Sequence, residues 1–129
     1  MIVLDASALV DVVLDQPAAE WVLERLTDGD IHAPAHQSAE VLLAVSRQVR
    51  AGELEAAEAE NALKEASDLP QQLVSPTADQ VRRAFALRER IRVLDGLYVA
   101  LAEQHGCALV TTDHRLAGAR PPCEVLSPV

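Results

Sequence analysis

The chain has 129 residues, half of them apolar, which suits a single domain over residues 1–129 with a core that needs neither disulfides nor metals. No apolar run approaches the ~20 residues of a membrane span and no basic-plus-apolar leader opens the chain, so we expect a soluble, cytoplasmic protein with no membrane partner. The net charge of −9 disfavours a nucleic-acid partner, unless basic side chains gather locally or some of the acids bind metal cations.

Short apolar runs alternate with helical patterns along the chain. The runs predict strands at residues 1–5, 31–33, 73–75, 108–112 and 124–126. Apolar residues at helical spacing predict helices near residues 9–13, 18–26, 41–49, 53–68, 81–91 and 96–105. The strand runs lack alternating polar residues, as in strands buried on both faces of a parallel sheet. We therefore predict an α/β fold, a three-layer α/β/α sandwich with a central parallel sheet of about five strands.

Two acids stand at the ends of predicted strands. Asp5 ends the first strand and Asp113 follows the strand at 108–112. Parallel sheets carry their sites at the carboxyl ends of the strands, so both side chains are candidates for one site. Ser7 and Thr111 lie two residues from these acids and offer supporting hydroxyl groups. The alternative for each aspartate is that it only caps the helix behind it.

Glu40 is the third candidate and lies inside a predicted helix. The neighbours that share its face are His36, Gln37, Leu43 and Ala44, none of them a firmly cationic partner. The ion pair that usually stabilises a helix glutamate is therefore missing. Taken by itself, Glu40 also fits an ordinary surface position.

Asp95 is the fourth candidate and stands before the helix predicted at 96–105. An N-cap aspartate is the alternative for this residue. The two roles are compatible, because a carboxylate at a helix start can also reach a metal ion.

A cluster of these four acids would need a cation. Two carboxylates about 4 Å apart repel by roughly 4 kcal/mol at an effective dielectric near 20. Magnesium takes oxygen ligands and uses one or two direct carboxylates. A bound cation can activate water and stabilise charge on a scissile phosphate, so the cluster predicts phosphodiester hydrolysis.

The sequence resembles the PIN-domain family, and within it the VapC toxins of prokaryotic type II toxin–antitoxin pairs. The resemblance covers nearly the whole chain and is carried by four segments, at residues 2–9, 38–42, 94–102 and 109–116. They read Ile-Val-Leu-Asp-Ala-Ser-Ala-Leu, Ser-Ala-Glu-Val-Leu, Leu-Asp-Gly-Leu-Tyr-Val-Ala-Leu-Ala and Leu-Val-Thr-Thr-Asp-His-Arg-Leu. Each motif is weak alone, but the four in series are quite specific.

The resemblance implies a catalytic and metal-binding set with two supporting hydroxyls. The acids are Asp5, Glu40, Asp95 and Asp113, and the hydroxyls are those of Ser7 and Thr111. It also implies Mg²⁺ (or Mn²⁺) as the cofactor, endoribonuclease activity on RNA, a homodimer, and neutralisation by a cognate antitoxin protein. Gly96 departs slightly from the family pattern, and we expect it to loosen the start of its helix.

Other classes fit less well. A receiver-type signalling domain has adjacent acids after its first strand and a lysine after its last, whereas Asp5 is followed by Ala6 and Ser7. A phosphatase with an aspartate nucleophile needs a second acid two residues on, where this chain has Ser7. A PIN-fold or receiver-like binding module without nuclease activity stays open as an alternative.

Five of the eleven basic residues fall in one stretch, Arg82, Arg83, Arg88, Arg90 and Arg92. On a continuous helix, Arg82, Arg83 and Arg90 would share one sector. That sector is either a solvated face or a contact with RNA or a partner.

Cys107 and Cys123 lie near His105 and His114, which makes a zinc site conceivable. Their spacing matches no common ligand pattern, so we predict buried, inert thiols.

Trp21 is the sole tryptophan. We predict that it borders an antitoxin groove beside the third helix, with plain core packing as the alternative.

Overall fold

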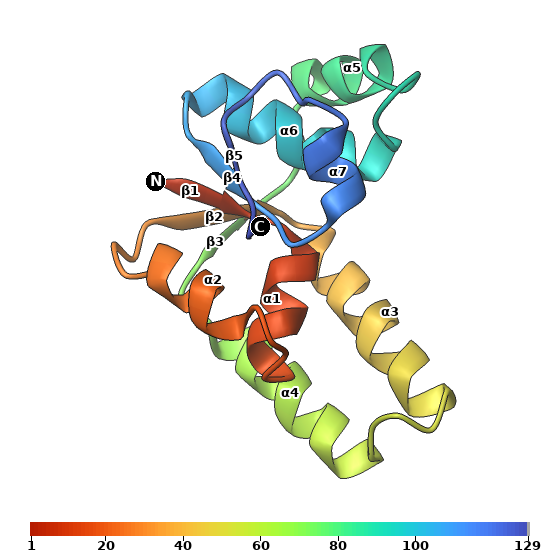
Figure 1. The fold of residues 1–129 in the computed structure, drawn as a ribbon. Coiled ribbons are helices and arrows are strands. Elements are labelled where there is room, and N and C mark those ends of the chain that lie inside the picture. Colours follow the sequence, from red (N-terminus) through yellow and green to blue (C-terminus); the bar gives the residue numbers. More distant parts are fainter. Residues whose placement is uncertain (129) are drawn as a thin grey trace.

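The computed structural model describes residues 1–128, in which five parallel strands form one sheet covered by helices on both faces (Figure 1). The strands are β1 (Ile2–Leu4), β2 (Ile31–Pro34), β3 (Gln72–Val74), β4 (Ala108–Val110) and β5 (Val125–Leu126). They lie in the order β3-β2-β1-β4-β5, so β1 is central. The predicted α/β/α sandwich is confirmed, with each strand within two residues of its expected bounds.

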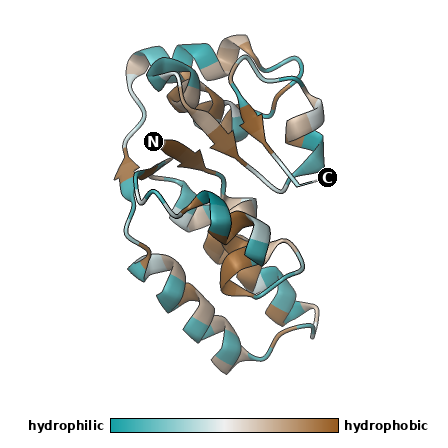
Figure 2. Ribbon diagram, turned by 60° about the vertical axis from the view of Figure 1, so that its left-hand side comes forward, coloured by the Kyte–Doolittle hydropathy of each residue, from teal (hydrophilic) through white to brown (hydrophobic). Residues whose placement is uncertain are grey.

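The central strands are apolar because both of their faces are covered. Val3, Leu4, Leu109 and Val110 are fully buried, as expected for a parallel sheet between two helical layers. Leu73 of the edge strand β3 is instead 44% exposed. Figure 2 shows the same contrast, with hydrophobic ribbon at the strands and α1 and hydrophilic ribbon on much of the outer helices.

Residues 1–128 contain seven helices, divided between the two faces of the sheet (Figure 1). One face carries α1 (Ala6–Val13), α2 (Ala19–Arg25), α3 (Gln37–Arg50) and α4 (Ala56–Asp68), and the other carries α5 (Ala78–Ala86), α6 (Val93–His105) and α7 (His114–Gly118). α3 and α4 pack side by side and extend beyond the sheet. Within the described residues, none of the helices combines the length and apolar character of a membrane crossing.

The prediction of a helix near residues 81–91 was wrong about where this helix ends. α5 stops at Ala86, and the chain tightens there, because the backbone N–H of Arg88 bonds to the carbonyl of Phe85 at 3.1 Å. The apolar spacing continues to Ile91 because this side chain is buried, although its backbone lies in the turn region after α5 and not in a helix. Arg90 therefore does not share a helix sector with Arg82.

α6 begins three residues earlier than predicted. Arg92 is its N-cap residue, and the N–H of Gly96 bonds to the Arg92 carbonyl at 2.8 Å. Asp95 consequently lies inside the first helical turn, and the N-cap alternative for this aspartate was wrong. The short helix α7 was not predicted, because five residues are too few to show a helical period.

Gly96 sets the distance between α5 and α6. A Cβ atom at this position would lie 3.0 Å from the Cβ of Ala84 and 3.1 Å from its Cα. Both residues are buried, so the missing side chain lets the two helices approach closely. Gly96 therefore has a packing role, which differs from the loosening of the helix start that its sequence position predicts.

Cys107 and Cys123 are free thiols and half-buried. Burial raises the pKa of both, to about 11 for Cys123, and nearby acids add to the effect. Thiols of this kind stay protonated at neutral pH, which agrees with the prediction that they are unreactive, although they are less deeply buried than expected.

Candidate active site

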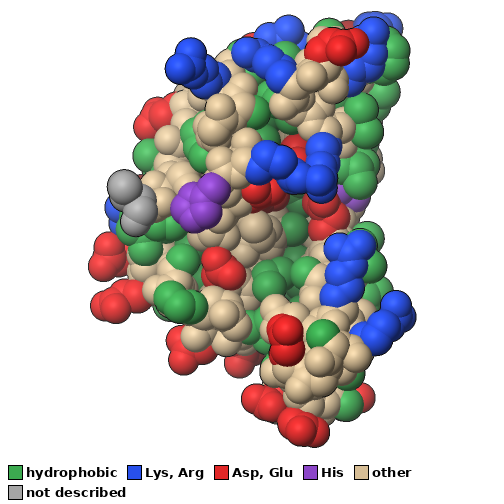
Figure 3. Space-filling view, turned by 45° about the vertical axis from the view of Figure 1, so that its right-hand side comes forward, with side chains coloured by type: hydrophobic (Ala, Val, Ile, Leu, Met, Phe, Trp, Pro, Cys, Tyr) green, Lys and Arg blue, Asp and Glu red, His purple; other side chains and the backbone are tan. Residues whose placement is uncertain are grey.

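A cavity of about 490 Å³ opens at the carboxyl ends of β1 and β4. All four acids singled out from the sequence line it, Asp5, Glu40, Asp95 and Asp113. They come from four places in the fold, the end of β1, the first turn of α3, the first turn of α6 and the residue before α7. In the space-filling view, acidic side chains lie in a hollow flanked by basic ones (Figure 3).

Asp5 is the most deeply placed of these acids, with 4% of its surface exposed. Its Oδ2 atom accepts hydrogen bonds from Ser7 Oγ at 2.6 Å and from Thr111 Oγ1 at 2.7 Å. Asp5 is the N-cap residue of α1, but its side chain makes no capping hydrogen bond within residues 1–128. Burial raises the pKa of Asp5 more than the two hydroxyl groups lower it, and the charges of Glu40 and Asp113 raise it further.

The two supporting hydroxyls join the segments that carry Asp5 and Asp113. Ser7 Oγ lies 3.2 Å from Thr111 Oγ1 and accepts a bond from the backbone N–H of Thr112 at 3.2 Å. Thr111 Oγ1 accepts from the N–H of Asp113 at 3.0 Å. These bonds fix the β1–α1 turn against the β4–α7 turn, so the two strand-end acids are held in register.

Glu40 is held by two aromatic rings that sequence reasoning did not assign to the site. Tyr98, which is fully buried, donates its hydroxyl to Glu40 Oε1 at 2.7 Å. His36 Nε2 lies 3.3 Å from the same oxygen and packs edge-on against the Tyr98 ring. Burial raises the pKa of Glu40, but contacts with His36 and Tyr98 outweigh it and leave the pKa below its ordinary value.

The sequence did hold a signal for Tyr98. It is the sole tyrosine of the chain, and it follows Asp95 by three residues, which places both side chains on one face of a helix. The contact with Glu40 itself spans 58 residues and is visible only in the fold.

Asp95 and Asp113 share one guanidinium group. Arg115 lies 3.7 Å from Asp95 Oδ2 and 3.2 Å from Asp113 Oδ2. Burial raises the pKa of Asp95 to about 6, helped by the charges of Asp5, Glu40 and Asp113 and opposed by Arg115.

Asp113 also caps α7. Its Oδ1 accepts the backbone N–H of Arg115 at 2.9 Å and that of Leu116 at 3.3 Å. The capping alternative for Asp113 is therefore correct, and it coexists with a place in the cavity.

The cavity carries a surplus of negative charge that suits a hard cation. Five carboxylates line it, because Asp11 joins the four acids, and they face three guanidinium groups, which leaves a formal charge of −2. Within residues 1–128, no three His, Cys, Asp or Glu side chains form a ready-made set of direct ligands. Magnesium uses one or two direct carboxylates and keeps several waters, so this donor chemistry still fits Mg²⁺ or Mn²⁺.

Comparison with known proteins gives a consistent family. The PIN-domain model matches residues 2–120. The chain is 41% identical to ribonuclease VapC3 of Mycobacterium tuberculosis over 121 residues, which are 93% of this chain and 88% of that one.

Two solved structures share the fold. VapBC2 from Rickettsia felis, bound to a DNA fragment from its promoter, has a TM-score of 0.70 at 18% identity and covers 98% of each chain. The sarcin-ricin loop cleaving toxin VapC20 of Mycobacterium tuberculosis has a TM-score of 0.69 at 15% identity and covers 93% of this chain and 95% of its own. The family model matches residues 2–120, a range that contains the positions of all four acids, and this family is neither the receiver-type nor the phosphatase alternative. The chain belongs to the PIN-domain family, and its sequence is similar to those of the VapC ribonucleases.

Proposed function

We propose that this protein is a divalent-cation-dependent endoribonuclease that acts as the toxin of a toxin–antitoxin pair. The observation that carries the proposal is the meeting of Asp5, Glu40, Asp95 and Asp113 in one cavity at the carboxyl ends of β1 and β4. The 41% identity to ribonuclease VapC3 supports RNA as the substrate.

The chain's own hydrogen bonds suit these acids to an ion. Mg²⁺ or Mn²⁺, when bound, would make water more acidic and stabilise charge on the scissile phosphate. Ser7 and Thr111 both donate to Oδ2 of Asp5, which leaves Oδ1 for a cation. Tyr98 occupies Oε1 of Glu40 and leaves Oε2. Each carboxylate is thus oriented by a neighbour before any ion arrives.

The decisive experiment replaces Asp5. The variant Asp5→Asn keeps the size of the side chain but removes its charge. We expect the rate of magnesium-dependent RNA cleavage to fall by more than roughly 100-fold, because loss of a residue that only supports a ligand already costs up to about that much. Circular dichroism should be unchanged. Asp28→Asn, at an exposed position outside the cavity, is the matched control and should cleave like the parent. Equal cleavage by Asp5→Asn would overturn the catalytic assignment.

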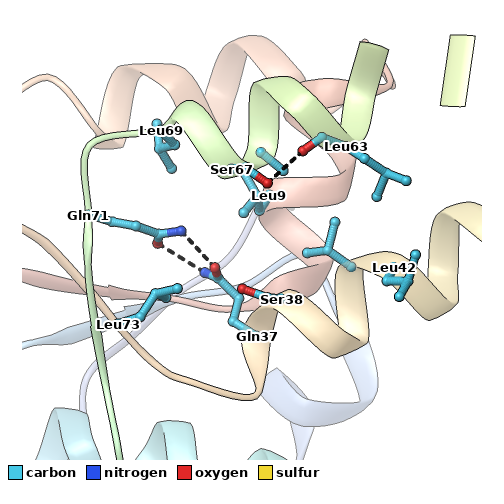
Figure 4. A pocket seen from close by; sticks show the side chains of 11 residues that line it. Leu9, Gln37, Ser38, Leu42, Leu63, Ser67, Leu69, Gln71 and Leu73 are labelled. Atoms are coloured by element: carbon cyan, nitrogen blue, oxygen red, sulfur yellow. Dashed lines mark hydrogen bonds between the residues drawn. The ribbon is translucent and has the colours of Figure 1, made fainter. Parts of the chain in front are cut away.

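We also propose a cognate antitoxin, which binds along α3 and α4. VapBC2, which shares the fold, is a complex. A groove of about 310 Å³ runs between α1, α3, α4 and β3, and leucine side chains surround the hydrogen-bonded pair Gln37 and Gln71 in it (Figure 4). Leu42 at its border is 53% exposed and offers apolar area to a partner.

Trp21 is not among the residues that line this groove within residues 1–128. It is half-buried on α2, beneath the Arg25 guanidinium at 4.3 Å, so the core alternative describes it better than the groove. Leu42→Glu should weaken binding of the proposed antitoxin. Leu23→Glu, equally exposed on α2, should not. Equal capture by the two variants would contradict the placement on α3.

A homodimer stays a proposal, and α5 offers the best surface for it. Val81 and Phe85 are 50% and 60% exposed on this helix, and Val93 and Leu94 are about as exposed at the start of α6. Phe85→Glu should shift sedimentation toward a monomer, with Leu23→Glu as the control. A parent that sediments as a monomer at all concentrations would end this proposal.

A further inference from the structure

Three arginines line the acidic cavity, and within residues 1–128 only one of them is paired with its acids. Arg115 contacts Asp95 and Asp113. Arg47 and Arg92 also line the cavity, yet neither is within ion-pair distance of a carboxylate in residues 1–128. A guanidinium beside surplus carboxylates would be expected to pair with one of them. These two groups are free to bind an anion that enters from outside.

The two arginines come from opposite faces of the sheet. Arg47 lies seven residues after Glu40 on α3, which at about 100° per residue returns it to nearly the same side of the helix, roughly 10 Å further along. Arg92 is the N-cap residue of α6 and precedes Asp95 by three residues. Both are exposed, and basic side chains stand on both sides of the hollow in Figure 3. The acids therefore lie between two outward-reaching cations.

We propose that Arg47 and Arg92 bind the backbone phosphates on either side of the scissile one and so hold an RNA strand across the acids. This rests on the proposed ribonuclease function. A chain with a net charge of −9 repels RNA, and the residues that line the cavity account for −2 of that charge, so affinity must come from local cations. Guanidinium groups suit this task, because their planar donors match phosphate oxygens in pairs.

The structure separates the arginines at 82–92 that have partners inside the protein from the one that lines the acidic cavity. Arg82 pairs with Asp79 and Arg83 pairs with Glu103, so both are occupied. Arg88 lies over the Phe85 ring at 4.0 Å. Of the residues in this stretch, Arg92 is the one that lines the acidic cavity. Its partner in the proposed site, Arg47, lies outside the stretch and carried no signal in the sequence.

Equilibrium binding of a labelled single-stranded oligoribonucleotide tests the proposal. We would measure it on the Asp5→Asn protein over a series of salt concentrations, because the proposed loss of cleavage in this variant would keep the oligoribonucleotide intact. Adding Arg47→Gln or Arg92→Gln should weaken binding roughly five- to tenfold. Each should also reduce the slope of log affinity against log salt by about 0.7, the value for one phosphate contact on a single strand.

Arg50→Gln is the matched control, because Arg50 is exposed on the same helix as Arg47 but does not line the cavity. It should leave affinity and slope unchanged. Titration with Mn²⁺ is done on Arg47→Gln and Arg92→Gln in the protein that keeps Asp5, and on the parent. The three Mn²⁺ affinities should be equal, which separates loss of phosphate binding from damage to the acidic site.

If the Arg47, Arg92 and Arg50 variants all bind RNA as tightly as the Asp5→Asn protein without these changes, the inference is overturned. The nuclease proposal would stay intact if the parent still cleaves RNA. Equal weakening by all three would also overturn it, because a diffuse charge effect would then explain the binding. Absence of both RNA binding and cleavage in every protein would overturn the inference together with the proposed function.

Discussion

The two halves of the acidic cavity hold their carboxylates in different ways. Asp5 and Glu40 accept hydrogen bonds from hydroxyl groups, those of Ser7, Thr111 and Tyr98. Asp95 and Asp113 instead face the guanidinium group of Arg115. A hydroxyl group orients a carboxylate and leaves its charge in place, whereas an arginine compensates the charge.

The first pair of carboxylates is therefore oriented by its neighbours, whereas the charge of the second pair is partly neutralised by its neighbour. Hydroxyl donors hold one oxygen of each carboxylate in the first pair and so fix its orientation. The second pair is stabilised by a side chain that is 52% exposed and can turn away. Burial acts in both halves, because it raises the pKa of Asp5 in the first pair and that of Asp95, to about 6, in the second.

Removal of the Tyr98 hydroxyl should have the largest effect of three variants that test this comparison. Tyr98→Phe keeps the buried ring but leaves Glu40 without its hydroxyl donor, so the affinity for Mn²⁺ should fall about 10- to 100-fold. Isothermal titration calorimetry measures this directly. Thermal unfolding of the metal-free variant would show whether the fold is intact. An unchanged Mn²⁺ affinity would mean that Glu40 needs no orientation by Tyr98.

Replacing Asp95 should stabilise the metal-free protein. A pKa raised from 3.8 to about 6 means that the folded state binds protons more readily than the unfolded chain. The parent should therefore become more stable through this group as pH falls from 7 through 6, and less stable as pH rises. Asp95→Asn should remove that dependence and raise the free energy of unfolding at pH 7 by on the order of 1–2 kcal/mol.

Urea unfolding in EDTA at pH 7 and pH 5 measures the effect of Asp95→Asn. Asp28→Asn, exposed and outside the cavity, should match the parent at both values. Divalent-cation affinity of the parent should move in the opposite direction and weaken below pH 6, because a protonated carboxylate is a poor ligand. A loss of stability at pH 7 in Asp95→Asn would contradict the claim that burial and the neighbouring carboxylates make the charged form of Asp95 unfavourable.

Removal of the Arg115 charge should have the smallest effect. Arg115→Gln takes away the cation that competes for Asp95 and Asp113, so Mn²⁺ affinity should rise roughly threefold. Metal-free stability should fall by less than about 1 kcal/mol, as for other exposed ion pairs. Arg50→Gln controls for loss of one surface charge. Weaker Mn²⁺ binding in Arg115→Gln would show that the arginine supports the ion site instead of competing with it.

The sheet and the strand-end acids could be predicted because each depends on local sequence. Continuous apolar runs identify buried parallel strands, and an acid directly after such a run must lie at the ligand edge of the sheet. Asp5 and Asp113 follow from this rule alone. Glu40 and Asp95 had local alternatives, and the family pattern was needed to choose between them.

Contacts between distant segments could not be predicted in the same way. The bond from Tyr98 to Glu40 joins α6 and α3, which lie on opposite faces of the sheet, and nothing near either residue in the sequence encodes that meeting. The end of α5 was misplaced because Ile91 is buried from a turn with the spacing of a helix. The start of α6 was misplaced because Asp95 before Gly96 resembles a cap, whereas the helix already begins at Val93.

The hydrogen bond between Thr111 and Asp5 joins residues 106 positions apart and has a consequence for synthesis of the chain. A nascent polypeptide that has not yet reached β4 lacks both Thr111 and Asp113, and its first strand has no neighbour on that side. The site that carries the proposed function is therefore completed only after the chain has been synthesised beyond β4.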